Sequence, residues 1–301
     1  CCNEHHYQAG MLLSGTGDAL AFQWEFVLSG TAIHKAVQKL GGSKSITVKL
    51  PDWLHRKEGE ELLQEVSYHY MEGRKPGLST ISGKGYRVPF DVKSGGCGAA
   101  MRAMCIGYPW PEQLSSLAAV AVETRRMTHL HPTGFLGAVV SALFAAYAEA
   151  CPIAKEFVKS AGYAVSVTER DSGYFAEKWE WFLKLRGLSS GEGPVIWADQ
   201  YGTAERDAAY KSFSWSGWAG RSGHDAPMIA LDALRGAGSN WEELMNRAGF
   251  HGGDSDITAV IACCCRGLLY GPEGVPECNY SNLEYRDRLE NSAEKLYELS
   301  C

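Results

Sequence analysis

The sequence has no apolar run long enough to cross a membrane. Its longest such run, Gly134 to Ala148, falls short of the roughly 20 residues that a membrane-spanning helix needs. The front of the chain also has no signal-peptide pattern. An excess of positive charge is missing too, because the net charge is -6. We therefore expect no membrane partner and no nucleic-acid partner.

The ten cysteines do not form the spaced framework of a small secreted domain. Cys263 to Cys265 lie within an apolar stretch, where thiols are expected to be small buried side chains. This predicts a reducing, cytoplasmic setting. Residues 1–6 contain two cysteines and two histidines, but adjacent cysteines are poorly spaced for zinc. We expect these six residues to be unordered.

The alternating pattern of a half-exposed β-strand is also absent, and helical spacing takes its place. The sequence predicts one all-α domain over residues 1–301, without a clear internal boundary and most simply a monomer. Two helices, Thr133–Ala150 and Ser255–Leu269, are apolar nearly all round and should be central. Other helices are predicted over Tyr7–Phe22, Ala32–Leu40, Glu58–Tyr70, Ala99–Ile106, Pro111–Met127, Ile153–Ala161, Tyr174–Leu185, Ala204–Lys211, Ala226–Leu234, Trp241–Ala248 and Leu283–Leu299.

Two glycines, Gly15 and Gly17, lie inside the first predicted helix. Each costs about 1 kcal/mol relative to alanine in a helix interior. The usual reason for such a cost is the close approach of another backbone or of a ligand.

The segment His251-Gly252-Gly253-Asp254-Ser255-Asp256 places two aspartates one residue apart at a predicted helix start. Aspartate is favoured there because its oxygens accept the free N–H groups of the first turn. Two carboxylates at this spacing can also direct oxygens at one hard cation such as Mg²⁺. For an isolated Asp-x-Asp the capping interpretation is preferred.

Three further loops are rich in polar residues and glycine. Residues 94–102 form a glycine-rich loop leading into a predicted helix, which suits either a phosphate or a simple chain reversal. His129 and His131 lie between two helices, and we expect hydrogen-bonded loop histidines rather than metal ligands. Residues 214–225 combine tryptophan, serine and glycine, which suits a sugar or nucleotide, or a solvent loop capped by Asp225.

Taken in order, five motifs resemble the ADP-ribosylglycohydrolase family, and within it the ADP-ribosylarginine hydrolase branch. They are Gly-Asp-Ala-Leu from Gly17, Gly-Cys-Gly-Ala-Ala-Met-Arg from Gly96, Met-Thr-His-Leu-His-Pro-Thr-Gly from Met127, Ser-Gly-His-Asp-Ala-Pro-Met from Ser222, and His-Gly-Gly-Asp-Ser-Asp from His251. The similarity covers the chain from about Tyr7 to about Leu289.

The resemblance implies an orthogonal helical bundle, two metal ions, usually Mg²⁺, and cleavage of the N-glycosidic bond between ADP-ribose and arginine on modified proteins. By resemblance, Asp254 and Asp256 are metal ligands, the catalytic residues are Asp254, Asp256 and Glu25, and Asp18 also lies near the catalytic centre. The implied substrate-binding residues are Gly96, Cys97, Gly98, Ala99, Met101, His129, His131, Ser214, Ser216, Gly217, Gly220, Ser222, Gly223, His224 and Asp225.

The chain departs from the family where metals should bind. The family's early Ser/Thr-Asp-Asp-Thr motif is missing, since no Asp-Asp occurs anywhere in the sequence, and the family pattern implies that a segment is skipped between Trp53 and Leu54. Ile257 also stands where the family has Ser or Thr. We therefore expect at most one weakly held Mg²⁺, at Asp254 and Asp256.

Three interpretations follow from the match and its departures. The chain is a Mg²⁺-dependent ADP-ribosylarginine hydrolase with impaired activity, or a catalytically inactive protein that binds ADP-ribose, or a defective or alternatively spliced product with no stable function. A helical scaffold unrelated to the family is a distant fourth.

Overall fold

The computed structural model describes residues 4–24, 27, 29–48, 92–108, 114–126, 128–146, 169–190 and 194–300. These residues form helices and loops, and among them there are two isolated β-bridges but no strand. The predicted all-α class is therefore confirmed. Glu25 and the predicted helices Glu58–Tyr70 and Ile153–Ala161 lie outside the described residues, as does the chain around Trp53.

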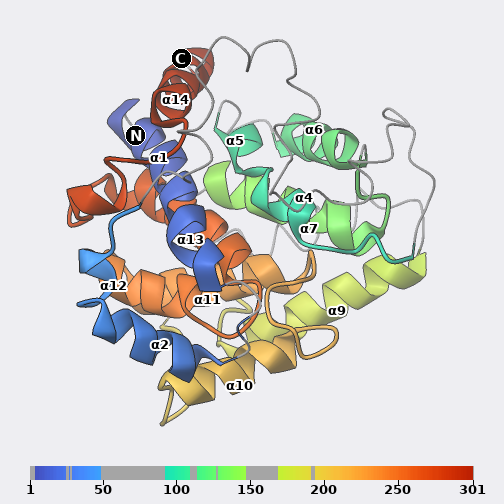
Figure 1. The fold of residues 1–301 in the computed structure, drawn as a ribbon. Coiled ribbons are helices and arrows are strands. Elements are labelled where there is room, and N and C mark those ends of the chain that lie inside the picture. The colour runs from blue at the N-terminus through green and yellow to red at the C-terminus, as the bar shows by residue number, and fades with distance from the viewer. Residues whose placement is uncertain are drawn as a thin grey trace.

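The helices run in several directions rather than as one parallel bundle (Figure 1). None of those that the structure describes has the length and apolar character required to span a bilayer. In chain order the helices are α1 (Glu4–Ala21), η1 (Phe22–Trp24), α2 (Gly30–Lys39), η2 (Ser43–Ser45), α4 (Gly98–Met101), α5 (Met104–Gly107), α6 (Leu114–Arg126), α7 (Pro132–Ala146), α9 (Glu169–Leu185), α10 (Thr203–Phe213), α11 (Asp225–Ala237), α12 (Trp241–Leu244), the π-helix η7 (Met245–Gly249), α13 (Ser255–Tyr270), η8 (Glu277–Asn279) and α14 (Arg286–Ser300).

Helices α1 and α13 run antiparallel in direct contact, and glycine makes that contact possible. A Cβ on Gly17 would lie 2.8 Å from the carbonyl oxygen of Ala259 and 2.9 Å from the Cys263 sulfur. Toward the other end of the pair, Gly267 lies just as closely against Ala9. The expected close approach at the first helix is thus the approach of α13. This antiparallel packing brings the C-terminal end of α1 close to the N-terminal end of α13 (Figure 1).

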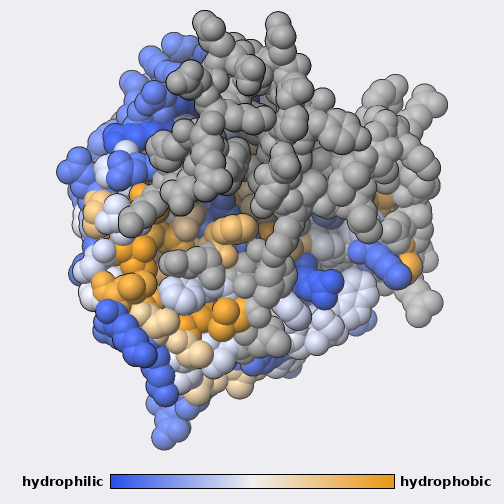
Figure 2. All heavy atoms as spheres, viewed as in Figure 1, coloured by the Kyte–Doolittle hydropathy of each residue, from blue (hydrophilic) through white to orange (hydrophobic). Residues whose placement is uncertain are grey.

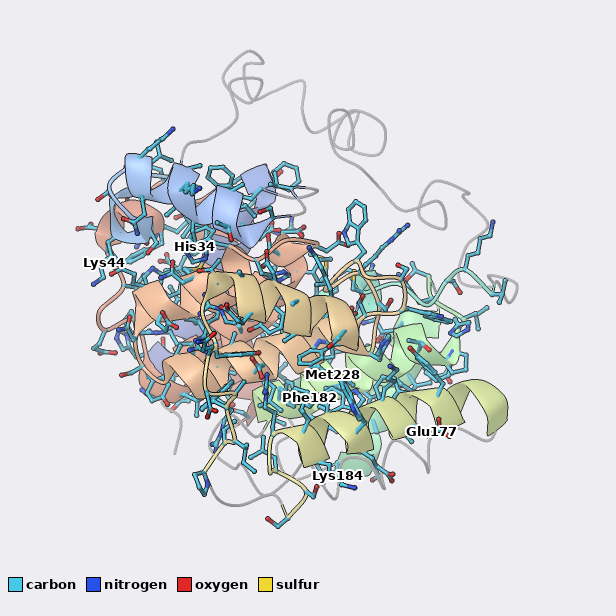
Figure 3. The ribbon with its side chains drawn as sticks, turned by 90° about the horizontal axis from the view of Figure 1, so that it is seen from below. His34, Lys44, Glu177, Phe182, Lys184 and Met228 are labelled. Atoms are coloured by element: carbon cyan, nitrogen blue, oxygen red, sulfur yellow. The ribbon has the colours of Figure 1, made fainter. Side chains whose placement is uncertain are left out.

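The core has two apolar clusters. The first surrounds α1 and α13 and includes the three consecutive cysteines, which are at most 2% exposed, as predicted. The second lies around α7 and α9. Figure 3 shows Phe182 of α9 beside Met228 of α11 in this second cluster, while Glu177 and Lys184 lie away from it. Both α7 and α13 are buried along nearly their whole lengths, which confirms their predicted central position.

On the face of the molecule drawn in Figure 2, exposed apolar side chains occupy one region and polar side chains surround it. Figure 2 shows hydrophobic residues gathered near the middle of the face, with hydrophilic residues over α14 at its top. Helix α14 is amphipathic and packs against α1, where a Cβ on Gly15 would touch Leu283 and Leu289.

Three predicted boundaries are wrong. Residues 4–6, expected to be unordered, form the first turn of α1, because His6 bonds through its ring to the Leu268 carbonyl at 2.7 Å. Helix α9 begins at Glu169, five residues before the predicted start at Tyr174. The predicted helix Ala99–Ile106 consists of two one-turn helices, because the Ala103 N–H bonds three residues back and ends α4.

Candidate functional site

Three of the loops predicted to be functional meet in the structure. They are the glycine loop (Ser94–Met101), the tryptophan loop (Ser214–Asp225) and the aspartate loop (His251–Asp256). They are far apart in sequence, and the tryptophan loop lies between the other two, with one isolated β-bridge to each. The sequence motifs therefore identify one place in the fold.

Main-chain hydrogen bonds hold the glycine loop to the tryptophan loop. The Cys97 N–H donates to the Arg221 carbonyl at 3.0 Å, and the Gly223 N–H donates to the Gly95 carbonyl at 3.0 Å. Gly223 is required at its position because a Cβ there would lie 2.9 Å from the carbonyl carbon of Thr133 in α7. The tryptophan loop thus rests directly on the backbone of a central helix.

The tryptophan loop is joined to the aspartate loop in the same way. The Asp254 N–H donates to the Ala219 carbonyl at 2.9 Å. On its other side the aspartate loop is held by Asp207 of α10, whose carboxylate accepts the N–H groups of Gly252 at 3.1 Å and of Gly30 in α2 at 2.6 Å. The position of Asp254 is therefore fixed from two directions.

The carboxylate of Asp254 is partly exposed at the junction of the three loops. The Trp218 indole Nε1–H donates to its Oδ1 at 2.6 Å, and the Cys97 thiol lies 3.8 Å from its Oδ2. Burial raises the pKa of Asp254, while the Trp218 hydrogen bond and the positive charge of Arg221 oppose that rise. Of the two aspartates in the Asp-x-Asp pair, Asp254 is the more accessible, because Asp256 is only 7% exposed.

Asp225 is completely buried and forms hydrogen bonds with the backbone of the loop that precedes it. Its carboxylate accepts the N–H groups of Ser222 at 2.8 Å and Gly220 at 3.1 Å. Burial raises the pKa of Asp225 to about 7, and the two backbone donors oppose the rise. This is the capping role that the sequence left open, so Asp225 shapes the tryptophan loop instead of facing a ligand.

In the described part of the chain, the side chains do not fit a site for two metal ions. Among the residues that the structure describes, no group of three or more His, Cys, Asp or Glu side chains is arranged to hold a metal ion. Asp254 already accepts hydrogen bonds from protein donors, and Ile257 offers no oxygen. Two Mg²⁺ ions need near-octahedral oxygen ligands and several carboxylates between them.

The two loop histidines are hydrogen-bonded within the protein, as predicted. His129 Nδ1 lies 2.9 Å from the Thr128 hydroxyl, and its ring borders the glycine loop, 3.4 Å from where a Gly98 Cβ would lie. Burial, followed by the charges of nearby arginines, lowers the pKa of His129 to about 4. His131 is buried, and its Nδ1 accepts the Thr133 N–H at 3.2 Å.

An aromatic group covers the outer side of the tryptophan loop. Trp215 is 51% exposed and stacks on Tyr174 of α9, with ring centroids 5.3 Å apart. His131 and the buried His224 both contact this pair edge-on or tilted. His224 also bonds to the Phe213 carbonyl at 3.1 Å.

The remaining predicted residues differ in what they can offer a ligand. Gly96, Gly98, Met101 and Ser214 are partly exposed, and Ser216 and Gly217 are exposed at the loop tip. The buried ones are Cys97, Ala99, Gly220, Ser222 and Gly223. Asp18 follows Gly17, so it lies toward the end of α1 that approaches the start of α13.

Sequence reasoning missed three residues of the site. Trp218 and Arg221 lie inside a loop that was singled out, but nothing in the sequence distinguished the tryptophan that meets Asp254 from Trp215. Asp207 had no signal at all, because its partners Gly30 and Gly252 are far from it in sequence.

Comparison with known proteins gives a consistent picture. A model of the ADP-ribosylglycohydrolase family matches residues 3–301. ADP-ribosylhydrolase ARH1 of Dictyostelium discoideum is 35% identical over 368 residues, which covers 98% of this chain and 94% of that protein. Because this alignment is longer than the chain of 301 residues, it includes positions of the relative that have no counterpart here.

Two further matches are more distant. A protein of Acanthamoeba polyphaga mimivirus, L444, whose name describes an ADP-ribosyl glycohydrolase, is 27% identical over 253 residues, or 73% of this chain and 49% of that protein. A solved structure of an ADP-ribosylglycohydrolase-related protein complex has the same fold, with a TM-score of 0.58, 21% identity and 99% coverage of both chains. With the family model matched along nearly the whole chain, this protein belongs to the ADP-ribosylglycohydrolase family.

Proposed function

We propose that this chain removes ADP-ribose from arginine side chains of modified proteins by hydrolysing the N-glycosidic bond, at a rate reduced by the loss of the early Asp-Asp motif. The observation that carries the proposal is the meeting of the three loops, which puts backbone groups of the glycine loop next to the partly exposed Asp254. The name of the 35% identical ARH1 relative supports the same class of reaction.

In the proposed hydrolysis the protein orients the substrate and water and transfers a proton. The oxygen of water bonds to the ribose carbon, the carbon–nitrogen bond breaks, and the guanidine leaves with a proton. In this proposal Asp254 takes a proton from that water, and the Trp218 N–H supports its orientation. Since the side chains in the described part of the chain do not fit two Mg²⁺ ions, no step is assigned to a metal.

A hydrolysis assay on arginine-ADP-ribosylated protein, with and without Mg²⁺, tests the proposal. We expect slow release of ADP-ribose that is lost in Asp254→Asn. The matched control is Asp287→Asn, which makes the same change at an exposed site on α14. Release that is unaffected by Asp254→Asn would contradict the assigned role, and no release from any arginine-modified substrate would contradict the activity.

A second function is favoured by one observation, that no Asp-Asp pair exists in the sequence to face Asp254 and Asp256. On this proposal the chain binds ADP-ribose without cleaving the linkage. Binding would then be unchanged by a metal chelator, and modified protein would be retained intact. Calorimetry with ADP-ribose in the presence and absence of chelator distinguishes this function from hydrolysis.

A further inference from the structure

A diphosphate at the junction of the three loops would lie among negative charges. The Asp254 Oδ2 lies 3.8 Å from the Cys97 thiol of the glycine loop, and the Asp225 carboxylate accepts N–H groups of Ser222 and Gly220 in the adjoining tryptophan loop. Helix α4 at the end of that loop has only one turn, Gly98–Met101, and its dipole can contribute little. Binding a diphosphate here therefore requires a positive side chain.

Arg221 has the position that such a side chain needs. Its carbonyl accepts the Cys97 N–H at 3.0 Å, so its backbone lies directly opposite the glycine loop. Its guanidinium lies over the Trp218 ring, 5.6 Å from the ring centroid, and Trp218 is itself bonded to Asp254. An aromatic ring contacts the face of a guanidinium, so the N–H donors at its edges remain able to bind a ligand.

The donors of Arg221 are also uncommitted. The residue is exposed, and within the described part of the chain it makes no ion pair. The two other arginines near the glycine loop already bond to protein. Arg102 donates to the Gly98 carbonyl and to the Thr128 hydroxyl, each at 2.7 Å, and Arg125 is buried and donates to the Arg102 carbonyl.

We propose that Arg221 binds the diphosphate of the ligand at this site through its guanidinium N–H groups, supplying positive charge next to the glycine loop. The inference rests on the proposed binding of ADP-ribose. It adds a residue that neither the sequence motifs nor the resemblance indicated, and it predicts that affinity for the ligand depends on one exposed guanidinium.

Isothermal titration calorimetry with ADP-ribose and with adenosine tests the inference. In Arg221→Met the affinity for ADP-ribose should fall roughly 10- to 100-fold, the range expected for the loss of a hydrogen bond to a charged group. Arg221→Lys should fall less, because it keeps the charge but loses the forked geometry. Affinity for adenosine, which has no phosphate, should not change. Arg288→Met, at an exposed arginine on α14, is the matched control.

The outcomes separate this inference from the proposed function. If the unaltered protein binds ADP-ribose and Arg221→Met binds it equally well, the role of Arg221 is wrong and the proposed function stands. If the unaltered protein does not bind ADP-ribose but binds inorganic pyrophosphate through Arg221, the proposed function is wrong and the anion site stands. If it binds neither ligand, both are wrong.

Discussion

Two buried histidines should make this protein less stable in acid, because both are held without charge. Burial lowers the pKa of His224 and of His251 to about 4, and both are at most 2% exposed. His224 bonds to the Phe213 carbonyl, and the ring of His251 lies 2.8 Å from the Thr258 hydroxyl. Among the residues that the structure describes, neither ring has a negatively charged hydrogen-bond partner.

Proton linkage gives the direction in which the free energy of unfolding changes with pH. In the unfolded chain a histidine binds its proton near pH 6.5, whereas in the folded protein these two do so only near pH 4. Between these values the unfolded state binds more protons, so the free energy of unfolding falls as the pH falls. The stability is fully present above pH 6.5 and is lost as the pH approaches 4. Each histidine accounts for roughly 3 kcal/mol of that loss.

Together the two losses are comparable to the ~5–15 kcal/mol of net stability that a domain usually has, and the raised pKa of Asp225 opposes them over part of the same pH range. The assay is urea denaturation at a series of pH values from 7.5 to 4.5, which gives the slope of unfolding free energy against pH. His251→Gln should reduce that slope by about 1.4 kcal/mol per pH unit. His5→Gln, at an exposed residue of α1, should leave it unchanged. An equal slope in His251→Gln and the unaltered protein would refute the reasoning.

Three further predictions concern packing and metals. Arg186 Nε and Asp232 Oδ1 form a buried ion pair 2.5 Å apart. Arg186→Met or Asp232→Asn should each lower the free energy of unfolding, measured by urea denaturation, by about 3–5 kcal/mol, because each leaves the other member of the pair uncompensated. The double variant should lose less than the sum of the two single variants. Gly17→Ala should lower the melting temperature because its Cβ meets α13, whereas Gly173→Ala, with open space around its Cβ, should raise it. A Mg²⁺ titration should show at most one weakly bound ion, and two tightly bound ions would reveal ligands not recognised here.

The sequence predicted the structure best where a single kind of interaction decides how a segment packs. Apolar residues all round a helix can only be buried, so the central positions of α7 and α13 were predictable. Glycine inside a helix indicated close approach, and α13 meets Gly17 in that way. The break at Ala103 was not predictable, because Ala99–Ile106 has good helix formers throughout and the turn depends on the local hydrogen bond to Ala100.

In the candidate site, too, the sequence could predict only part of the arrangement. Ordered motifs identified the three loops, but a motif does not say which side chains within a loop meet across the junction. Trp218 and Trp215 are three residues apart in one loop; the first donates to Asp254 and the second stacks on Tyr174. That difference depends on how the tryptophan loop rests on α7 through Gly223, which is a tertiary contact.

The way the loops are joined bears on what the loss of metal ligands should do. The bonds from Cys97 to Arg221 and from Asp254 to Ala219 connect main-chain atoms, so they do not depend on any catalytic side chain. Metal ions, in contrast, are held by side-chain oxygens from separate segments, and the early pair is missing from the sequence. Because the two kinds of interaction are independent, the proposed loss of the carboxylate motif would remove chemistry while the backbone framework of the proposed ligand site remains. Affinity for ADP-ribose should therefore be retained better than its release from arginine.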